Sequence, residues 1–264
     1  MRTPGLYARL LAENGFVALA YDSAYQGESG GEPRGLEDPA HRIEDLKAGV
    51  SFLTTRSEVD PDRIGALGIC ASGGYVLCAT ASDHRIKAVG TVSAVDIARQ
   101  FRNGADGTHD PAVFQHMLDA AAAARAAEAH GESPQTFQLF PGTAEQARAR
   151  GRHVLEGFEY YISGPTAHPR SAKFLTWSSI DHMAFFDAFH FVNLIGQRPL
   201  LMIAGNRAVT AWMSIHAFQN AAGPKGLHWI DGASHNDLYY KKQYVDPSVE
   251  KLTGFFTQNL GQAA

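Results

Sequence analysis

Short apolar runs alternate with segments of helical periodicity along this chain, and this alternation restricts its possible folds more than any other feature. Five runs are predicted to be strands, at residues 16–22, 63–70, 86–93, 199–205 and 226–232. The first is continuously apolar with a polar end, as expected of a strand buried on both faces. Strands that alternate with helices favour a mostly parallel sheet flanked by helices, so the predicted fold class is α/β.

The helical segments are recognised by their apolar spacing. Within residues 43–53, apolar side chains recur three and four residues apart and form one stripe, made of Ile43, Leu46, Val50 and Leu53. That helix is expected to end before Pro61, because proline disfavours helical geometry in the residue before it. Further helices are expected over residues 6–14, from about Gly73 onward, and over residues 248–260.

The segment 96–197 interrupts the alternation and is too long to be a simple connection. It contains an Ala-rich helical pattern over 116–130, a second over 143–161, and a closing aromatic cluster (Trp177, Phe185, Phe186, Phe189 and Phe191). We interpret it as a helical cap over one end of the sheet, inserted between core segments 1–95 and 198–264. The alternative is a helical extension that does not contact the functional site.

Composition excludes several classes of protein. With 45% hydrophobic and 19% charged residues, the chain fits one large globular domain or a core with an inserted cap. A net charge of -4 gives no support to nucleic-acid binding, and no run approaches the roughly 20 apolar residues of a membrane span. Because two cysteines do not make a disulfide framework and no signal sequence is present, a cytoplasmic location is predicted.

The sequence around Cys70 predicts a nucleophile on a sharp turn between a strand and a helix. Such a turn needs small residues two positions before and after the nucleophile, and Gly68 and Ser72 stand there. The next backbone N–H, that of Ala71, is then expected to face the oxyanion formed during acyl transfer. The N-terminus of the following helix also favours the thiolate over the thiol.

Two other readings of this segment stay open. Ser72 is the rival nucleophile, but it falls one step into the predicted helix and is flanked by Cys70 and Gly74. Alternatively, Cys70 is a small buried residue at the end of a strand. This interpretation does not explain why glycines stand at positions 68, 73 and 74. Cys78 is interpreted as a core residue.

His235 is the candidate base, because it follows the last predicted strand and a returning loop would bring it near Cys70. Imidazole takes and returns a proton near neutral pH. A histidine on a polar loop can also be merely solvated. The acid is less defined: Asp96 follows the 86–93 strand and is our choice over Asp237, while the loop 205–210 contains no carboxylate. A cysteine and a histidine can also work without an acid.

These residues, taken in order, resemble the α/β-hydrolase superfamily over nearly the whole chain. The resemblance is to the dienelactone-hydrolase-like and polyketide-transferase-like branch with a helical cap. It rests on segments 22–31, 60–65 leading into the Cys70 turn, 156–161, 168–169, 198–203 and 232–235. It implies an enzyme acting on ester, lactone or thioester bonds, with no metal and no organic cofactor.

The chain departs from this family in two places. The family usually has its acid in the loop after the 199–205 strand, where this chain offers Val209. Members also carry earlier strands and a His-Gly-type loop that supplies the second oxyanion donor. We therefore expect the N-terminal strands to be missing, with a gap in the sheet between residues 16–22 and 63–69. We hypothesise that Met1 is an internal start codon or that the gene is truncated.

The predicted function is hydrolysis through a Cys70 acyl-enzyme, with His235 as base, Asp96 as acid and Ala71 as oxyanion donor. The alternatives are an acyltransferase of the same fold and a catalytically impaired protein that binds a ligand or partner. The expected partner is a small-molecule ester, lactone or thioester. Nucleic acid and membranes are not expected as partners, and assembly into a homodimer is left open.

Overall fold

The computed structural model describes residues 3–261, which form two compact units. The core unit comprises residues 3–21, 43–97 and 187–261, and the inserted unit comprises residues 22–42 and 98–186. The predicted insertion, 96–197, was a single segment. The inserted unit is instead discontinuous, because residues 22–42 pack with it.

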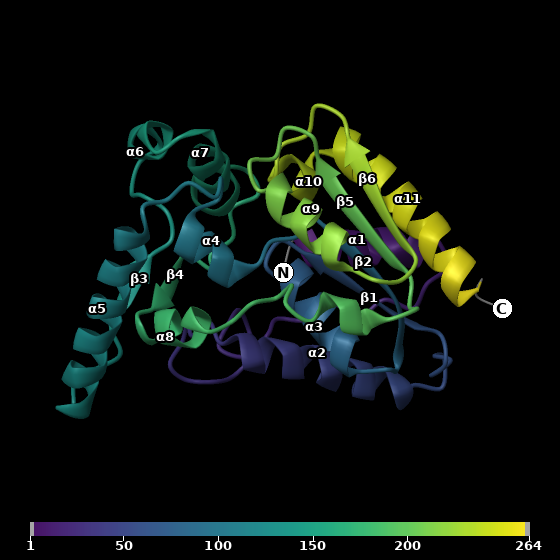
Figure 1. Ribbon diagram of the computed structural model, residues 1–264, viewed down its shortest axis with the longest axis horizontal. Helices are drawn as coiled ribbons and strands as arrows, with labels where there is room; N and C mark the ends of the chain where they lie inside the picture. The colour runs from purple at the N-terminus through teal and green to yellow at the C-terminus, as the bar shows by residue number, and fades with distance from the viewer. Residues whose placement is uncertain (1–2, 262–264) are drawn as a thin grey trace. The chain divides into compact units, whose positions relative to one another are not determined.

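The core unit contains a four-stranded parallel sheet (Figure 1). Its strands are β1 (Ile64–Ile69), β2 (Ile86–Val92), β5 (Leu200–Gly205) and β6 (Lys225–Ile230), in the order β1-β2-β5-β6. Four of the five predicted strands and the α/β class are thereby confirmed. Because the strands are parallel, their carboxyl ends meet at one edge of the sheet, where ligand sites of such sheets usually lie.

The strand predicted at residues 16–22 is wrong. This segment has no regular secondary structure, and among the described residues β1 pairs only with β2. Val17 is 55% exposed and Leu19 is 38% exposed, so the run is not covered on both faces. Apolar composition alone does not make a strand, because a strand also needs a hydrogen-bonding neighbour.

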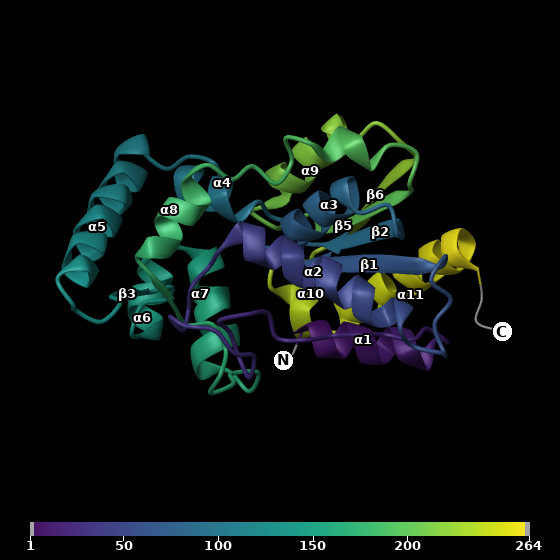
Figure 2. The ribbon, with the colours of Figure 1, turned by 90° about the horizontal axis from the view of Figure 1, so that it is seen from below.

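Helices pack on both faces of the sheet (Figure 2). Those with residues in the core unit are α1 (Thr3–Glu13), α2 (Pro39–Thr54), α3 (Ser72–Ser82), η2 (Val192–Ile195), α9 (Ala211–Asn220), α10 (Asp237–Tyr240) and α11 (Lys242–Leu260). The helices predicted at 6–14, around 43–53 and from Gly73 are confirmed. The last helix begins earlier than predicted, at Lys242, and contains Pro247.

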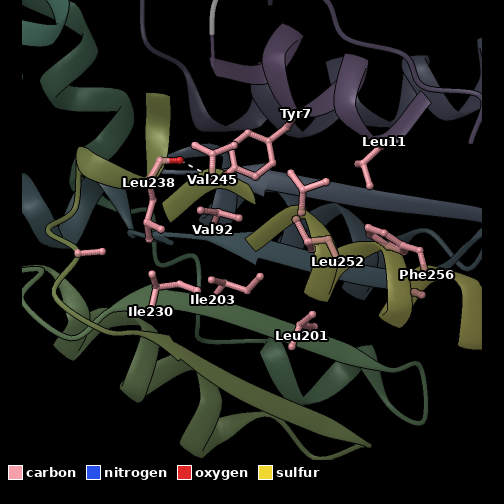
Figure 3. Close-up of a cluster of buried hydrophobic side chains, with 13 residues drawn as sticks. Tyr7, Leu11, Val92, Leu201, Ile203, Ile230, Leu238, Val245, Leu252 and Phe256 are labelled. Atoms are coloured by element: carbon pink, nitrogen blue, oxygen red, sulfur yellow. Dashed lines mark hydrogen bonds between the residues drawn. The ribbon is translucent and has the colours of Figure 1, made fainter. Parts of the chain in front are cut away.

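Two apolar clusters hold these layers together. The larger joins α1 and α11 to the strands and includes Tyr7, Val92, Ile203 and Leu252 (Figure 3). The second lies on the other face and joins α2 and α3 to β1 and β2 through Val50, Ile64, Ala79 and Ile86. The apolar stripe of residues 43–53 thus faces the core, as its spacing predicts.

The inserted unit is mostly helical, as predicted. Its elements are α4 (Ile97–Asn103), α5 (Pro111–Ala129), β3 (Thr136–Gln138), α6 (Ala144–Ala149), α7 (Arg152–Phe158), η1 (Glu159–Ser163), β4 (Phe174–Thr176) and α8 (Ser178–Ala184). β3 and β4 pair antiparallel. The helix predicted over 143–161 is interrupted at Gly151, whose φ of 100° is outside helical geometry.

Residues 22–42 are bound to the inserted unit by backbone groups. The Thr176 N–H donates to the Gly35 carbonyl at 3.1 Å, and the Glu37 N–H donates to Ser179 Oγ at 2.9 Å. Within residues 3–261, each helix is too short or too polar to cross a bilayer.

Candidate active site

Cys70 lies on the turn between β1 and α3, in a backbone conformation that is rare for a residue with a side chain. Its φ is +58°, in the left-handed region. The Cys70 N–H donates to the Val92 carbonyl at 3.0 Å, while its carbonyl accepts from the N–H groups of Gly73 at 2.9 Å and Val95 at 3.0 Å. Because these three hydrogen bonds hold the backbone of Cys70, the surrounding structure enforces its strained conformation.

Close packing explains the small residues around this turn. A Cβ atom at Gly68 would lie 2.2 Å from the Ser72 carbonyl oxygen, and one at Gly73 would lie 2.6 Å from the Ala94 Cβ. A larger residue at either position would displace backbone. Ser72, the rival nucleophile, is exposed and is the first residue of α3.

The turn places Cys70 directly before the N-terminus of α3, a helix of 11 residues. The helix dipole favours a negative charge at this end. A thiolate is such a charge, so the position favours the reactive form of a cysteine. Cys70 is partly exposed, as attack on a bound substrate requires.

Cys78 lies two turns further along the same helix and has a different environment. Its Sγ donates a hydrogen bond to the Ala188 carbonyl at 3.3 Å. Burial, and then the negative charges of Asp96 and Asp187, raise the pKa of Cys78 to about 12. Cys78 therefore stays a neutral thiol at physiological pH.

His235 follows β6 and is buried, with 3% of its surface exposed. Its Nδ1 lies 2.6 Å from Thr210 Oγ1, and its Nε2 lies 2.6 Å from the Tyr239 hydroxyl. Its backbone carbonyl accepts a hydrogen bond from Ser93 Oγ at 3.1 Å. Since Ser93, Thr210 and His235 follow β2, β5 and β6, three loops meet at the carboxyl edge of the sheet.

One short segment links Cys70 and His235. Val92 and Val95 hydrogen-bond to the backbone of Cys70, and Ser93, between them in sequence, binds the loop of His235. Ser93 also has a left-handed φ of 48°. The predicted nucleophile and base are therefore both hydrogen-bonded to residues 92–95.

The two candidate carboxylates have different partners. Asp96 is fully buried, and its Oδ2 accepts a hydrogen bond from the Ala188 N–H at 2.9 Å. Asp237 Oδ2 accepts from the Ser234 N–H at 2.9 Å, and its Oδ1 pairs with Lys241 Nζ at 2.6 Å. Burial would raise the pKa of Asp237, but the Lys241 and Ser234 bonds outweigh it, so this pKa is lowered. Asp237 thus fixes the loop that carries His235.

Thr210 and Tyr239 were not predicted from the sequence. A carboxylate was expected in the loop 205–210, so Thr210, which follows Val209 and whose hydroxyl binds His235, was passed over. Tyr239 follows His235 by four residues on a short helix, so helical spacing is the signal that would have indicated it. Among the described residues, His, Cys, Asp and Glu side chains do not gather into a group that could hold a metal ion.

Comparison with known proteins identifies relatives of this chain. It is 39% identical over 260 residues to the uncharacterized protein YcjY of Escherichia coli K12, an alignment that covers 98% of this chain and 84% of YcjY. The crystal structure of PA2218 from Pseudomonas aeruginosa matches with a TM-score of 0.86 and 32% identity, covering 98% of this chain and 80% of that one.

More distant relatives are fungal proteins. The thiohydrolase aneE of Aspergillus aculeatus is 25% identical, covering 88% of this chain and 73% of its own length. The polyketide transferase claH of Penicillium crustosum is 26% identical, covering 95% and 81%. The crystal structure of the α/β hydrolase GrgF from Penicillium matches with a TM-score of 0.80 and 21% identity, covering 97% of this chain and 84% of that one. This match confirms the predicted fold, whereas the dienelactone-hydrolase-like activity stays a prediction.

The family model described as X-Pro dipeptidyl-peptidase (S15 family) matches residues 2–237, which is most of the chain. The parallel sheet, the strained Cys70 turn and the convergent loops after β2, β5 and β6 agree with this match. The chain therefore belongs to the S15 family and has the α/β-hydrolase fold.

Proposed function

We propose that this protein transfers acyl groups through a covalent intermediate on Cys70, with esters, lactones or thioesters as substrates and water as the usual acceptor. The observation that carries the proposal is the left-handed Cys70 at the junction of β1 and α3. A strained backbone that presents a partly exposed nucleophile at a helix N-terminus suits acyl transfer.

In the acylation step, the Tyr239 hydroxyl, which lies 2.6 Å from His235 Nε2, turns away from that nitrogen. Cys70 then gives its thiol proton to Nε2, and the sulfur attacks the substrate carbonyl carbon. The Ala71 N–H is the proposed donor to the oxyanion. When the tetrahedral intermediate collapses, the bond to the leaving alcohol or thiol breaks and the leaving group takes the proton from Nε2.

In the deacylation step, water gives a proton to His235 Nε2 and its oxygen attacks the acyl-enzyme. The carbon–sulfur bond breaks, the acid leaves, and Cys70 regains its proton. Asp96 stays the predicted acid. It is fully buried and its Oδ2 accepts a hydrogen bond from the Ala188 N–H. Because Thr210 Oγ1 lies at His235 Nδ1, the proposed contribution of Asp96 is its negative charge and not a hydrogen bond to the imidazole.

Two observations favour thioesters among the substrates. A cysteine nucleophile exchanges readily with a thiol leaving group, and a distant relative is named a thiohydrolase. Another is named a polyketide transferase, which supports the second candidate function, transfer of the acyl group to an acceptor other than water.

The test is turnover of short acyl N-acetylcysteamine thioesters and p-nitrophenyl esters by the wild type and by Cys70→Ala. We expect the wild type to hydrolyse thioesters and the variant to lose turnover. Unchanged turnover in Cys70→Ala would remove Cys70 from the chemistry. Adding an alcohol or amine acceptor separates the two candidate functions, because a transferase then forms the acylated acceptor faster than the free acid.

A further inference from the structure

Both ring nitrogens of His235 hydrogen-bond to hydroxyl groups. Thr210 Oγ1, from the loop after β5, lies 2.6 Å from Nδ1, and the Tyr239 hydroxyl, from α10, lies 2.6 Å from Nε2. All three residues belong to the core unit and are buried, with 2% to 3% of their surface exposed. The imidazole is therefore held between two partners that are themselves fixed.

The chemistry of the two hydroxyls indicates which nitrogen carries the proton. A neutral imidazole has one N–H donor and one acceptor nitrogen. The phenol of Tyr239, with an ordinary pKa of about 10, is a stronger donor than the aliphatic hydroxyl of Thr210. Tyr239 accordingly donates to Nε2, and the Nδ1–H group of His235 donates to Thr210 Oγ1.

We infer that Thr210 is a positioning residue for His235, in the place where a carboxylate would otherwise orient the base. By accepting the Nδ1–H bond, its hydroxyl holds the imidazole in the tautomer whose Nε2 is able to take up a proton. This inference rests on the proposed role of His235 as the base.

Thr210 is itself well anchored for this role. It directly precedes α9, and its carbonyl accepts the Met213 N–H at 3.0 Å. Its hydroxyl differs from a carboxylate in one respect: it fixes the tautomer but adds no negative charge to stabilise the imidazolium. Tyr239 complements it, because its oxygen can accept a hydrogen bond from Nε2 once that nitrogen is protonated.

The tautomer can be measured without any substrate. We would label the full chain with [15N]histidine, record long-range 1H–15N correlation spectra at about pH 8.5, where an ordinary imidazole is neutral, and assign His235 with His235→Gln. The wild type should show protonated Nδ1 and unprotonated Nε2. Thr210→Val should shift the population toward the Nε2–H tautomer, and Thr210→Ser should restore the wild-type pattern.

Two further variants serve as matched controls. Thr80→Val removes another buried hydroxyl of the core unit, which bonds to the Val76 carbonyl inside α3, and should leave the His235 spectrum unchanged. Tyr239→Phe should keep the Nδ1–H tautomer, because Thr210 remains as acceptor. A wild-type-like His235 spectrum in folded Thr210→Val, or an Nε2–H tautomer in the wild type, would overturn the inference.

Kinetics give the second measurement. We expect Thr210→Val to lower kcat for thioester hydrolysis about 10- to 100-fold with little change in KM, and Thr210→Ser to recover most of the loss. A change in KM alone would contradict a positioning role. If the wild type has no acyl-transfer activity, the proposed function fails, whereas the spectra still decide whether Thr210 sets the tautomer.

Discussion

The two cysteines of this chain lie eight residues apart, and their surroundings give them opposite chemistry. Cys70 is on a strained turn before a helix N-terminus, partly exposed and connected to the loop of His235 through residues 92–95. Cys78 is inside α3 and bonded to a carbonyl, and burial, followed by the charges of two nearby carboxylates, raises its pKa and keeps it protonated. Residue type alone therefore says little about reactivity, whereas backbone geometry and local charge separate the two thiols.

The largest expected effect is on catalysis. Cys70→Ser should reduce thioester turnover by at least about 10³-fold, because a serine hydroxyl gives up its proton to His235 much less readily than a cysteine thiol does. Cys78→Ser should stay within about threefold of the wild type once differences in stability are corrected. Comparable losses in both variants, measured as kcat/KM, would remove the distinction between the two sites.

The second effect is on thiol alkylation. With a pKa of about 12, Cys78 is a thiolate in only roughly one molecule in 10⁴ at pH 8, so Cys70 should react with iodoacetamide about 10³-fold faster. Peptide mass spectrometry of each single-cysteine variant measures the two rates. Equal rates in the folded protein would contradict the comparison.

The third effect is on stability and tests the turn itself. Gly68→Ala puts a Cβ 2.2 Å from the Ser72 carbonyl oxygen and should lower the free energy of unfolding by about 2 kcal/mol or more. Gly254→Ala, on α11 with open space around the new methyl group, should instead raise it by about 0.5–1 kcal/mol. Urea unfolding of both variants provides the measurement; a neutral Gly68→Ala would mean that the turn has room to relax.

The smallest effect is on the loop that carries His235. Since the folded-state pKa of Asp237 is lowered, this group stabilises the protein above its ordinary pKa and loses that contribution as pH falls below it. Asp237→Asn should therefore cost about 1 kcal/mol at neutral pH, with the cost vanishing in acid. Unfolding of both proteins across pH checks the sign, and a cost that grows in acid would refute it.

The sequence predicted the sheet well because its central strands are long apolar runs between clear helical stripes. It failed at residues 16–22, where composition is strand-like but strand pairing is absent, and pairing depends on the rest of the fold. It also assigned residues 22–42 to the core, since the hydrogen bonds of Gly35 and Glu37 to residues of the inserted unit are not visible in a linear pattern.

At the candidate site, residues at fixed sequence offsets from one another could be predicted, whereas contacts between residues far apart in the sequence could not. The Cys70 turn was predictable because Gly68 and Ser72 stand at fixed offsets from it. Thr210 was not, because its contact with His235 joins residues 25 positions apart and an isolated threonine has no signature. Asp96 as the acid stays a prediction.

The most direct test of the central claim is to trap the acyl-enzyme. The wild type is mixed with an acyl thioester, quenched in acid, and digested with trypsin, which releases residues 64–85 with Cys70, Ser72 and Cys78 on one peptide. We predict one acyl group, placed on Cys70 by fragmentation, removed by neutral hydroxylamine and retained in Cys78→Ala. An acyl group on Ser72 or Cys78, or one that persists in Cys70→Ala, would contradict it.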